Sequence, residues 1–141
     1  MTADNARRYM RFWETMTPQS LGELDSLVTA DVHFRDPFHD LHGVAEMRRM
    51  LERMFEHLEA PRLVVTDSAE ANGLWMLRWT FDARTKKSGS AWHIVGMSEL
   101  ACAPDGRIRQ HIDHWDAARQ FYEDLPLLGA VLRAIRRRLS A

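Results

Sequence analysis

The side chains best suited to chemistry lie in two short stretches, residues 32–43 and residues 111–116. In the first stretch Asp36 stands directly before Pro37, which favours an extended backbone at residue 36. A carboxylate at such a corner, facing an apolar pocket, would have its pKa raised by desolvation and would serve as a general base. The alternative is an Asx-type turn in which the Asp36 side chain only shapes the corner. The residue types alone leave both interpretations open.

The second stretch contains His111, Asp113 and Trp115 at alternate positions, so a strand would place all three on one face. His111 and Asp113 then form either a second acid/base pair or hydrogen-bonding groups for a ligand. The alternative is a buried polar network in which they pair with each other, with Arg78 or with Arg109.

Three more polar residues share the first corner, namely His39, Asp40 and His42. Their types suit metal coordination, but their close spacing within one loop does not match a known zinc geometry. We therefore interpret them as polar turn and rim, and we predict neither a metal nor an organic cofactor.

Bulky apolar residues are numerous, with five Trp, six Phe and eight Met in 141 residues. They fit either a dense core or the wall of a large apolar cavity. The candidates for an aromatic wall are Phe12, Trp13, Trp75, Trp79, Phe81, Trp92 and Met97. Of these, Trp79 and Phe81 are the strongest candidates for the wall of a pocket.

Hydrophobic periodicity indicates which elements position these residues. A spacing of three to four residues predicts helices over residues 5–16, over a short segment capped by Ser20 with Glu23 three residues later, and over residues 44–58. A period of two then predicts four antiparallel strands, at residues 62–71, 74–83, 91–103 and 107–116. Helical spacing returns over residues 117–139, broken near Pro126 and Gly129.

This order of elements predicts an α+β fold. A cone-shaped, curved antiparallel sheet would wrap over three N-terminal helices, with an extra C-terminal helix, and would leave a space between sheet and helices. The length fits a single domain over residues 1–141, with residues 117–141 as a C-terminal helical extension.

Four short motifs occur in order along this pattern: Arg35-Asp36-Pro37-Phe38, His42-Gly43, Gly106-Arg107-Ile108 and Asp113-His114-Trp115. With them the chain resembles the nuclear transport factor 2-like superfamily, and within it the SnoaL-like and steroid delta-isomerase-like branch. The resemblance implies a ligand pocket inside the cone, and a homodimer, because many relatives pair through the outer face of the sheet.

In the steroid isomerases, the Asp of this corner moves a proton between two carbons of an enolisable ketone, and Asp36 matches it. A tyrosine on the first helix and a protonated Asp on the third strand of the meander hold the enolate oxygen there. Their places fall on Phe12 and near Ser98, so most of the oxyanion hole is missing, which is usually the largest catalytic term. Tyr9, one turn before Phe12, would partly substitute if it points to the same side.

Our leading hypothesis is therefore the binding of a small apolar molecule, with acid/base isomerase or cyclase chemistry on a ketone-like substrate. Asp36 would be the acid/base, assisted by His111 and Asp113. The predicted substrate contacts are Tyr9, Phe12, Trp13, Phe38, Trp79, Phe81, Ser98 and Trp115. One alternative is a non-catalytic ligand-binding or dimeric interaction module. Another is water activation by an Arg–Asp pair, as in the limonene epoxide hydrolases of the same superfamily, with Arg78 beside one of the two carboxylates.

Charge and composition limit the partners. The formal net charge of −1 argues against a nucleic-acid-binding surface, and no apolar run approaches the ~18 residues of a membrane span. The single Cys102 cannot form an internal disulfide, which favours the cytoplasm. The basic residues 133–138 alternate with apolar ones, so this helix is a candidate for a lid, a dimer contact or a weak membrane-surface contact. We favour the simplest interpretation, a basic tail that packs on its own domain.

Overall fold

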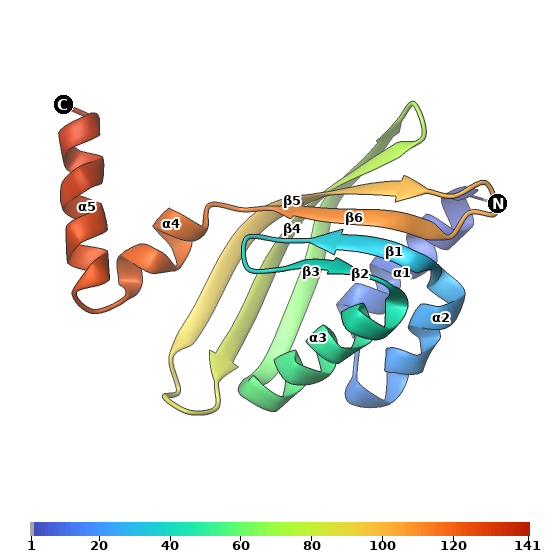
Figure 1. The fold of residues 1–141 in the computed structure, drawn as a ribbon, viewed down its shortest axis with the longest axis horizontal. Helices are drawn as coiled ribbons and strands as arrows, with labels where there is room; N and C mark the ends of the chain where they lie inside the picture. The colour runs from blue at the N-terminus through green and yellow to red at the C-terminus, as the bar shows by residue number, and fades with distance from the viewer. Residues whose placement is uncertain (1) are drawn as a thin grey trace.

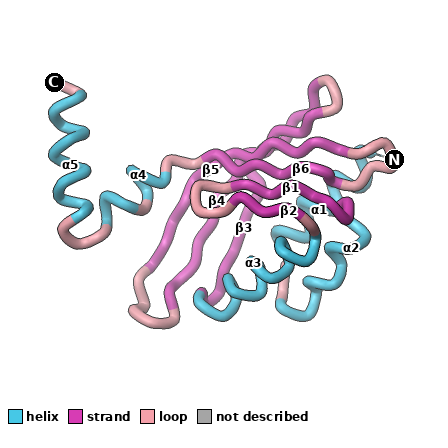
Figure 2. The backbone as a smooth tube through the Cα atoms, viewed as in Figure 1, coloured by secondary structure: helices cyan, strands magenta, loops and turns pink. Residues whose placement is uncertain are grey.

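The computed structural model describes residues 2–141, and its centre is one curved, unclosed sheet of six strands with helices against it (Figures 1 and 2). In chain order the elements are α1 (Thr2–Thr15), the 3-10 helix η1 (Pro18–Glu23), α2 (Leu24–Leu27), β1 (Val28–Arg35), β2 (Asp40–His42), α3 (Val44–His57), β3 (Leu58–Ala71), β4 (Leu74–Thr85), β5 (Ala91–Cys102), β6 (Ile108–His114), α4 (Ala117–Gln120), the 3-10 helix η2 (Tyr122–Asp124) and α5 (Leu128–Leu139). The α+β cone expected from the sequence is confirmed.

The strand order is β2-β1-β6-β5-β4-β3, and every neighbouring pair is antiparallel except β1 and β6, which run parallel. The parallel pairing sets Phe34 opposite His111 and Arg35 opposite Ile112. It therefore brings the corner at residue 36 beside the last strand, although the two are far apart in the sequence. Periodicity alone predicts each strand but not this pairing.

Helix α1 lies against the sheet (Figure 1), and hydrogen bonds near its start join it to α2 and to the turn between β5 and β6. The Asn5 side chain donates to the backbone oxygen of Leu27 at 3.1 Å and to that of Gly106 at 2.8 Å. Further along the helix, Tyr9 and Phe12 are fully or almost fully buried in the core, as their helical spacing predicts. The rotation of α1 about its axis is fixed by these contacts.

Two local details differ from the sequence-based expectation. The second helix begins as the 3-10 turn η1, and its N-cap is Thr17 in a capping box with Ser20, not Ser20 with Glu23. Strand β3 begins at Leu58, earlier than the expected residue 62. Pro61 is tolerated because it falls in a bulge of β3, which is an edge strand.

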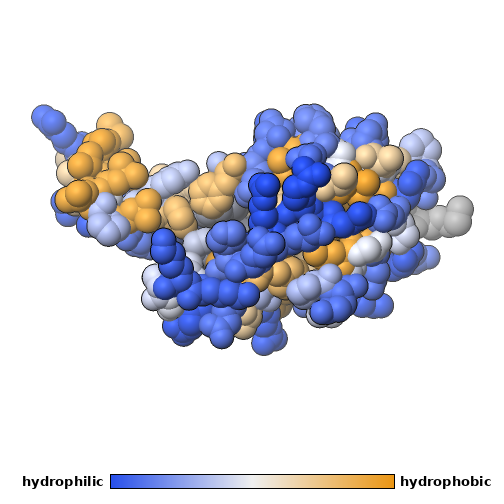
Figure 3. All heavy atoms as spheres, turned by 60° about the horizontal axis from the view of Figure 1, so that its bottom comes forward, coloured by the Kyte–Doolittle hydropathy of each residue, from blue (hydrophilic) through white to orange (hydrophobic). Residues whose placement is uncertain are grey.

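Helix α5 stands away from the sheet and packs on η2 (Figure 1). The buried carboxylate of Glu123 accepts a hydrogen bond from Arg136 Nε at 2.9 Å and fixes this arrangement. Figure 3 shows apolar side chains on the surface of this projecting segment. The exposed ones are Leu127, Leu128, Val131, Ile135 and Leu139. The expectation that the basic tail packs on its own domain is therefore wrong for α5. None of the helices within residues 2–141 has both the length and the apolar character needed to cross a membrane.

Close packing between β4 and β5 requires a glycine. The Trp79 indole covers Gly96, where an added Cβ would lie 2.5 Å from two ring carbons of Trp79 and 3.1 Å from Trp115 Cβ. We expect Gly96→Ala to lower the free energy of unfolding by about 1–3 kcal/mol, because overpacking displaces a buried ring. Urea denaturation measures this change.

Gly22→Ala is the matched control, since an added Cβ there meets nothing within 4 Å. Its free energy of unfolding should stay close to that of the wild type or rise slightly. If the two alanine variants were equally stable, the close approach of Trp79 to Gly96 would be refuted.

Candidate active site

A cavity of about 300 Å³ opens between the sheet and the helices α1 and α3. Its wall is mainly apolar, with Met10 from α1, Met54 from α3, and Leu77 and Ile94 from the sheet. The polar side chains on its wall are Asp36, His39, Arg53, His57, Ser98, His111 and Asp113. A more open depression shares Asp36, Asp113 and Trp115 with the cavity, so we identify it as the mouth.

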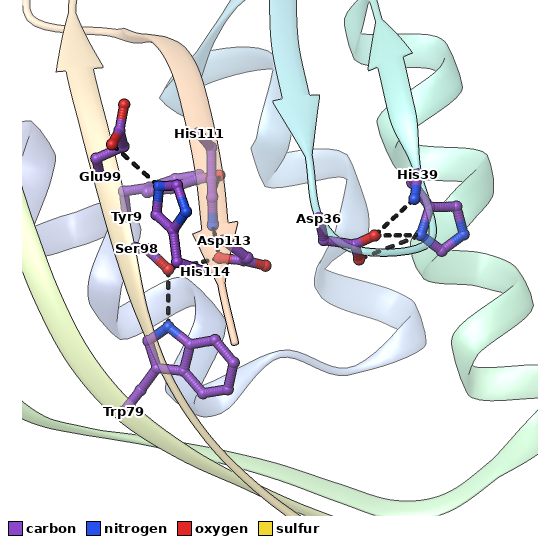
Figure 4. A network of polar contacts seen from close by, with 9 residues as sticks. All are labelled: Tyr9, Asp36, His39, Trp79, Ser98, Glu99, His111, Asp113 and His114. Carbon is purple, nitrogen blue, oxygen red and sulfur yellow. Dashed lines mark hydrogen bonds and ion pairs between the residues drawn. The ribbon is translucent and has the colours of Figure 1, made fainter. Parts of the chain in front are cut away.

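A chain of hydrogen bonds converges on Asp113 (Figure 4). His111 Nε2 lies 2.6 Å from Asp113 Oδ1, and Ser98 Oγ lies 2.5 Å from the same oxygen. Behind them, the Tyr9 hydroxyl lies 2.7 Å from His111 Nδ1, and Trp79 Nε1 lies 2.7 Å from Ser98 Oγ. Four elements, α1, β4, β5 and β6, thus contribute one network.

The chemistry of the donors fixes the direction of each bond. An indole N–H only donates and an ionised carboxylate only accepts, so Trp79 donates to Ser98 and Ser98 donates to Asp113. A neutral His111 with its proton on Nε2 donates to Asp113 and accepts from Tyr9 through Nδ1. With Asp113 ionised, every member is satisfied. No hydrogen bond from residues 2–141 reaches Asp113 Oδ2, which leaves this oxygen for a ligand.

Tyr9 serves the network from behind the cavity. It is completely buried, and this burial raises the pKa of Tyr9 far above its ordinary value. A hydrogen bond from Trp13 lowers the pKa in part, and the charge of Asp113 raises it by less. Tyr9 therefore remains a neutral hydroxyl donor. Neither Tyr9 nor Phe12 lines the cavity, so the prediction that they contact substrate is wrong: α1 turns both into the core and turns Trp13 toward the cavity.

The ring of Trp13 lines the cavity, whereas its N–H is buried beside Tyr9. Trp13 Nε1 has no well-aligned hydrogen-bond partner among residues 2–141, although it acts on the Tyr9 hydroxyl as a donor that lowers its pKa. A rotation of the indole would be needed to bring this N–H to a ligand oxygen in the cavity. The indole ring also packs 5.2 Å from the His111 ring, which places the donor beside the network.

Asp36 takes the structural role that the sequence left open, and its position is also compatible with the catalytic one. Its Oδ1 accepts hydrogen bonds from the backbone N–H of Phe38 at 2.8 Å, the backbone N–H of His39 at 2.7 Å and the His39 ring at 2.9 Å. The Asx-type turn is therefore present. The same side chain lines the cavity and is only 15% exposed. Its role as a base stays a prediction.

The remaining predicted positions divide clearly. Besides Asp36, His111 and Asp113, the predicted residues on the cavity wall are Trp13, Phe38, Trp79, Phe81, Trp92, Ser98 and Trp115. Trp75 and Met97 do not line the cavity. Arg78 is exposed on the other face of β4 and does not line the cavity, so the expected Arg–Asp pair for water activation cannot use it.

Sequence reasoning missed several residues at this site. Arg53 and His57 line the cavity from α3, and their spacing of four residues was an available signal, since it places both on one helix face. Phe121 packs its ring 5.1 Å from Phe38 and 5.3 Å from Trp92. The C-terminal extension thus joins the aromatic cluster at the mouth, a long-range contact with no local sequence signal.

The comparisons with known proteins agree with this architecture. A family model described as a SnoaL-like domain matches residues 6–111. A search of curated proteins finds no match. A hypothetical protein with a ketosteroid isomerase-like fold from Catenulispora acidiphila DSM 44928, crystallised with trimethylamine, has a TM-score of 0.70 at 15% identity, covering 85% of this chain and 91% of that one.

Two further solved structures carry functional descriptions of their own. A candidate SnoaL-like polyketide cyclase from Jannaschia sp. CCS1 has a TM-score of 0.72 at 11% identity, covering 83% of this chain and 88% of that one. AclR, a candidate hydroxylase from Streptomyces galilaeus, has a TM-score of 0.69 at 16% identity, covering 99% of this chain and 92% of that one. At these identities the likeness establishes the fold alone.

The hydrogen bond from Tyr9 to His111 can be tested by removing one atom. We expect Tyr9→Phe to lower the free energy of unfolding by about 1–3 kcal/mol, because it leaves the buried His111 Nδ1 without a donor. Urea denaturation measures the change. Tyr122→Phe is the matched control, since Tyr122 is partly exposed, and it should have little effect. A Tyr9→Phe variant as stable as this control would show that the network does not depend on Tyr9.

Proposed function

The chain belongs to the SnoaL-like domain family, and from that premise we propose that it binds a small apolar carbonyl compound in the cavity and moves a proton on it, as an isomerase or cyclase. The family and fold support ligand binding or isomerase and cyclase chemistry in general terms. The assignment to this chain rests on one observation. Asp113 has one oxygen held by two donors and the other left to an apolar cavity.

Asp113 is the proposed acid/base. The substrate places a carbon next to its carbonyl group against Asp113 Oδ2, which takes the proton from that carbon. His111 and Ser98 hold the carboxylate in place, and His111 itself is oriented by Tyr9. His111 also lines the cavity and stabilises the charge of Asp113 before the transfer.

The electrons of the broken C–H bond move onto the carbonyl oxygen, and a rotation of the Trp13 indole, whose ring lines the cavity, would bring its N–H to that oxygen. Donors aimed at developing charge usually supply the largest catalytic term. If the ketone carries a neighbouring double bond, the resulting dienolate takes the proton back from Asp113 at another carbon, which is isomerisation. Alternatively, the enolate carbon attacks a second carbonyl of the same molecule and closes a ring, and the new alkoxide takes the proton from Asp113.

Asp36 is the second proposed carboxylate. The resemblance to the steroid isomerases places the base at this residue, but three hydrogen bonds already converge on its Oδ1 and hold it in the turn. We therefore rank Asp113 first as the base and assign Asp36, at the mouth, to positioning the substrate.

The shape and lining of the cavity limit the substrate. A volume of about 300 Å³ lies at the lower end of the range for ligand sites and fits a small molecule. Trp79, Phe81 and Trp115 provide flat apolar contacts, whereas Arg53 and His57 provide one polar end. An apolar, planar ketone with a single polar substituent matches this lining.

A non-catalytic ligand-binding module is the second candidate. One observation favours it: the place of the isomerase tyrosine holds Phe12, which is buried in the core and has no hydroxyl. The enolate oxygen would then depend on Trp13 in place of the missing tyrosine. In that case the same contacts bind a ligand without accelerating a reaction.

The two candidates differ in the effect of Asp113→Asn, which keeps the shape of the side chain but removes its basicity. We expect this variant to lower turnover of an enolisable cyclic ketone by about 100-fold or more, the usual contribution of a general base. Tryptophan fluorescence should show nearly unchanged ligand binding. Turnover is followed by exchange of the α-proton with deuterated water.

Asp36→Asn is the matched comparison, with a smaller expected loss of about tenfold, because this carboxylate plays the secondary role. If Asp113→Asn retained turnover to within about twofold, Asp113 would not be the base. If neither the wild type nor the variants exchanged the α-proton of a bound ketone, the non-catalytic candidate would replace the enzyme.

We also propose that the protein is a homodimer formed through the outer face of the sheet. Three apolar side chains on this face, Met76, Val95 and Met97, are 38%, 38% and 51% exposed. Met76 lies on β4, and Val95 and Met97 lie on β5, with Glu99, Thr80 and Arg78 as their respective cross-strand partners. Exposed apolar side chains of this kind fit a self-complementary contact between two copies.

Light scattering at micromolar concentration should give a dimer for the wild type and a monomer for Met97→Glu. Leu127→Glu is the control, because this equally apolar residue is 87% exposed but lies in the C-terminal segment. It should leave the dimer intact. A monomeric wild type, or a dimer lost only in Leu127→Glu, would contradict the proposed interface.

A further inference from the structure

The outer face of the β1–β2 hairpin gathers three side chains of metal-binding types. His33 on β1 stands directly opposite His42 on β2, and Asp40 lies two residues before His42 on the same face. On the other face Phe34 and Leu41 pack into the core. A slip of one residue would expose that apolar pair, so the register that presents the three polar side chains is fixed by the core.

The three groups converge closely. His33 Nε2 lies 2.6 Å from Asp40 Oδ1, and His42 Nε2 lies 3.8 Å from the same oxygen. The two imidazole rings stack with centroids 4.3 Å apart and planes 5° from parallel. One ligand atom from each residue lies within 4.8 Å of those of the other two.

These distances are close to those that a metal ion needs. At a bond length of about 2.1 Å, tetrahedral ligand atoms lie roughly 3.4 Å apart. The separations of 2.6 and 3.8 Å lie on either side of this value. Because the two rings are stacked, an ion that replaces the proton shared by His33 and Asp40 requires at least one imidazole to rotate until both ring planes meet at the ion. The exposed side chains of Asp40 and His42 have room for this movement.

We propose that His33, Asp40 and His42 bind one divalent cation of the zinc class, with water in the fourth position. Two imidazoles and one carboxylate form a common ligand set for Zn²⁺, and imidazole also suits Co²⁺, Ni²⁺ and Cu²⁺. The site lies on the outer face of the sheet, away from the cavity, and is independent of the proposed catalytic function. It replaces the sequence-based expectation of no metal, which considered His39; that ring is bonded to Asp36 instead.

The ion would clamp the edge strand β2 onto β1. Strand β2 has three residues and β1 is its only partner strand in the sheet. One backbone hydrogen bond flanks β2 on each side. Asp36 N donates to His39 O at 3.0 Å, and Gly43 N donates to Val32 O at 2.8 Å. A cross-link between His33 and His42 holds both bonds closed and so steadies the turn that carries Asp36.

Two other surface pairs provide an internal comparison. His93 Nδ1 lies 2.6 Å from Asp82 Oδ1 across β4 and β5, and His114 Nε2 lies 3.0 Å from Glu99 Oε2 across β5 and β6. Each has a single histidine, whereas the hairpin site has two. Among the described residues, these two histidine–carboxylate pairs lack the third metal-binding side chain that the hairpin site has.

The test is a titration of tag-free, metal-stripped protein with Co²⁺, followed by its visible absorption, and with Zn²⁺ by calorimetry. We expect one ion per chain, and the intense absorption of tetrahedral Co²⁺. His42→Ala should weaken binding by at least about tenfold, since losing a residue that merely orients a metal ligand already costs this much. His93→Ala, the matched control, should leave the affinity unchanged.

Amide hydrogen exchange provides a second readout. Zn²⁺ should slow exchange at Asp36 and Gly43 in the wild type and in His93→Ala, but not in His42→Ala. The proposal would be overturned if the wild type bound no metal, if His42→Ala kept the wild-type affinity, or if His93→Ala lost as much affinity as His42→Ala. His42 is 71% exposed, and circular dichroism verifies that its replacement leaves the fold intact.

Discussion

The ionised carboxylate of Asp113, placed in an apolar cavity, is the constraint on which the site depends. A buried charge is tolerated only when it is hydrogen-bonded, and here Ser98 and His111 supply the donors. Each donor in turn needs its own partner, which Trp79 and Tyr9 provide. Hydrogen bonding of Asp113 therefore involves residues of α1, β4, β5 and β6. The position of Asp113 Oδ1 depends on the rotation of α1, which carries Tyr9, and on the packing of Trp79 over Gly96.

Much of the fold was predictable from the sequence because its signals are local. The period of two in β4 placed Trp79 and Phe81 on the inner face, and helical spacing located α1 and α3. The alternation of His111, Asp113 and Trp115 also placed all three on the cavity wall. The parallel pairing of β1 with β6 was not predictable, because no local pattern encodes which strands become neighbours.

The site itself was only partly predictable, for a similar reason. Sequence reasoning found the carboxylates but could not determine the rotation of α1, which turns Tyr9 and Phe12 into the core and Trp13 toward the cavity. Nor could it show that the hydrogen bonds of Asp36 are largely used within its own turn. Whether a carboxylate is free to react depends on its hydrogen-bond partners in the folded protein. These partners are the reason that we assign the base to Asp113 and not to Asp36.

The central claim is that Asp113 Oδ2 and Trp13 Nε1 act together on one carbonyl compound. A crystal structure with a bound planar enolate mimic, such as a phenol-type inhibitor, tests it most directly. The proposal predicts the ligand oxygen within hydrogen-bonding distance of Trp13 Nε1 and the adjacent ring carbon against Asp113 Oδ2. A ligand whose oxygen instead contacts Asp36 or Arg53, with Trp13 Nε1 still unpaired, would contradict it.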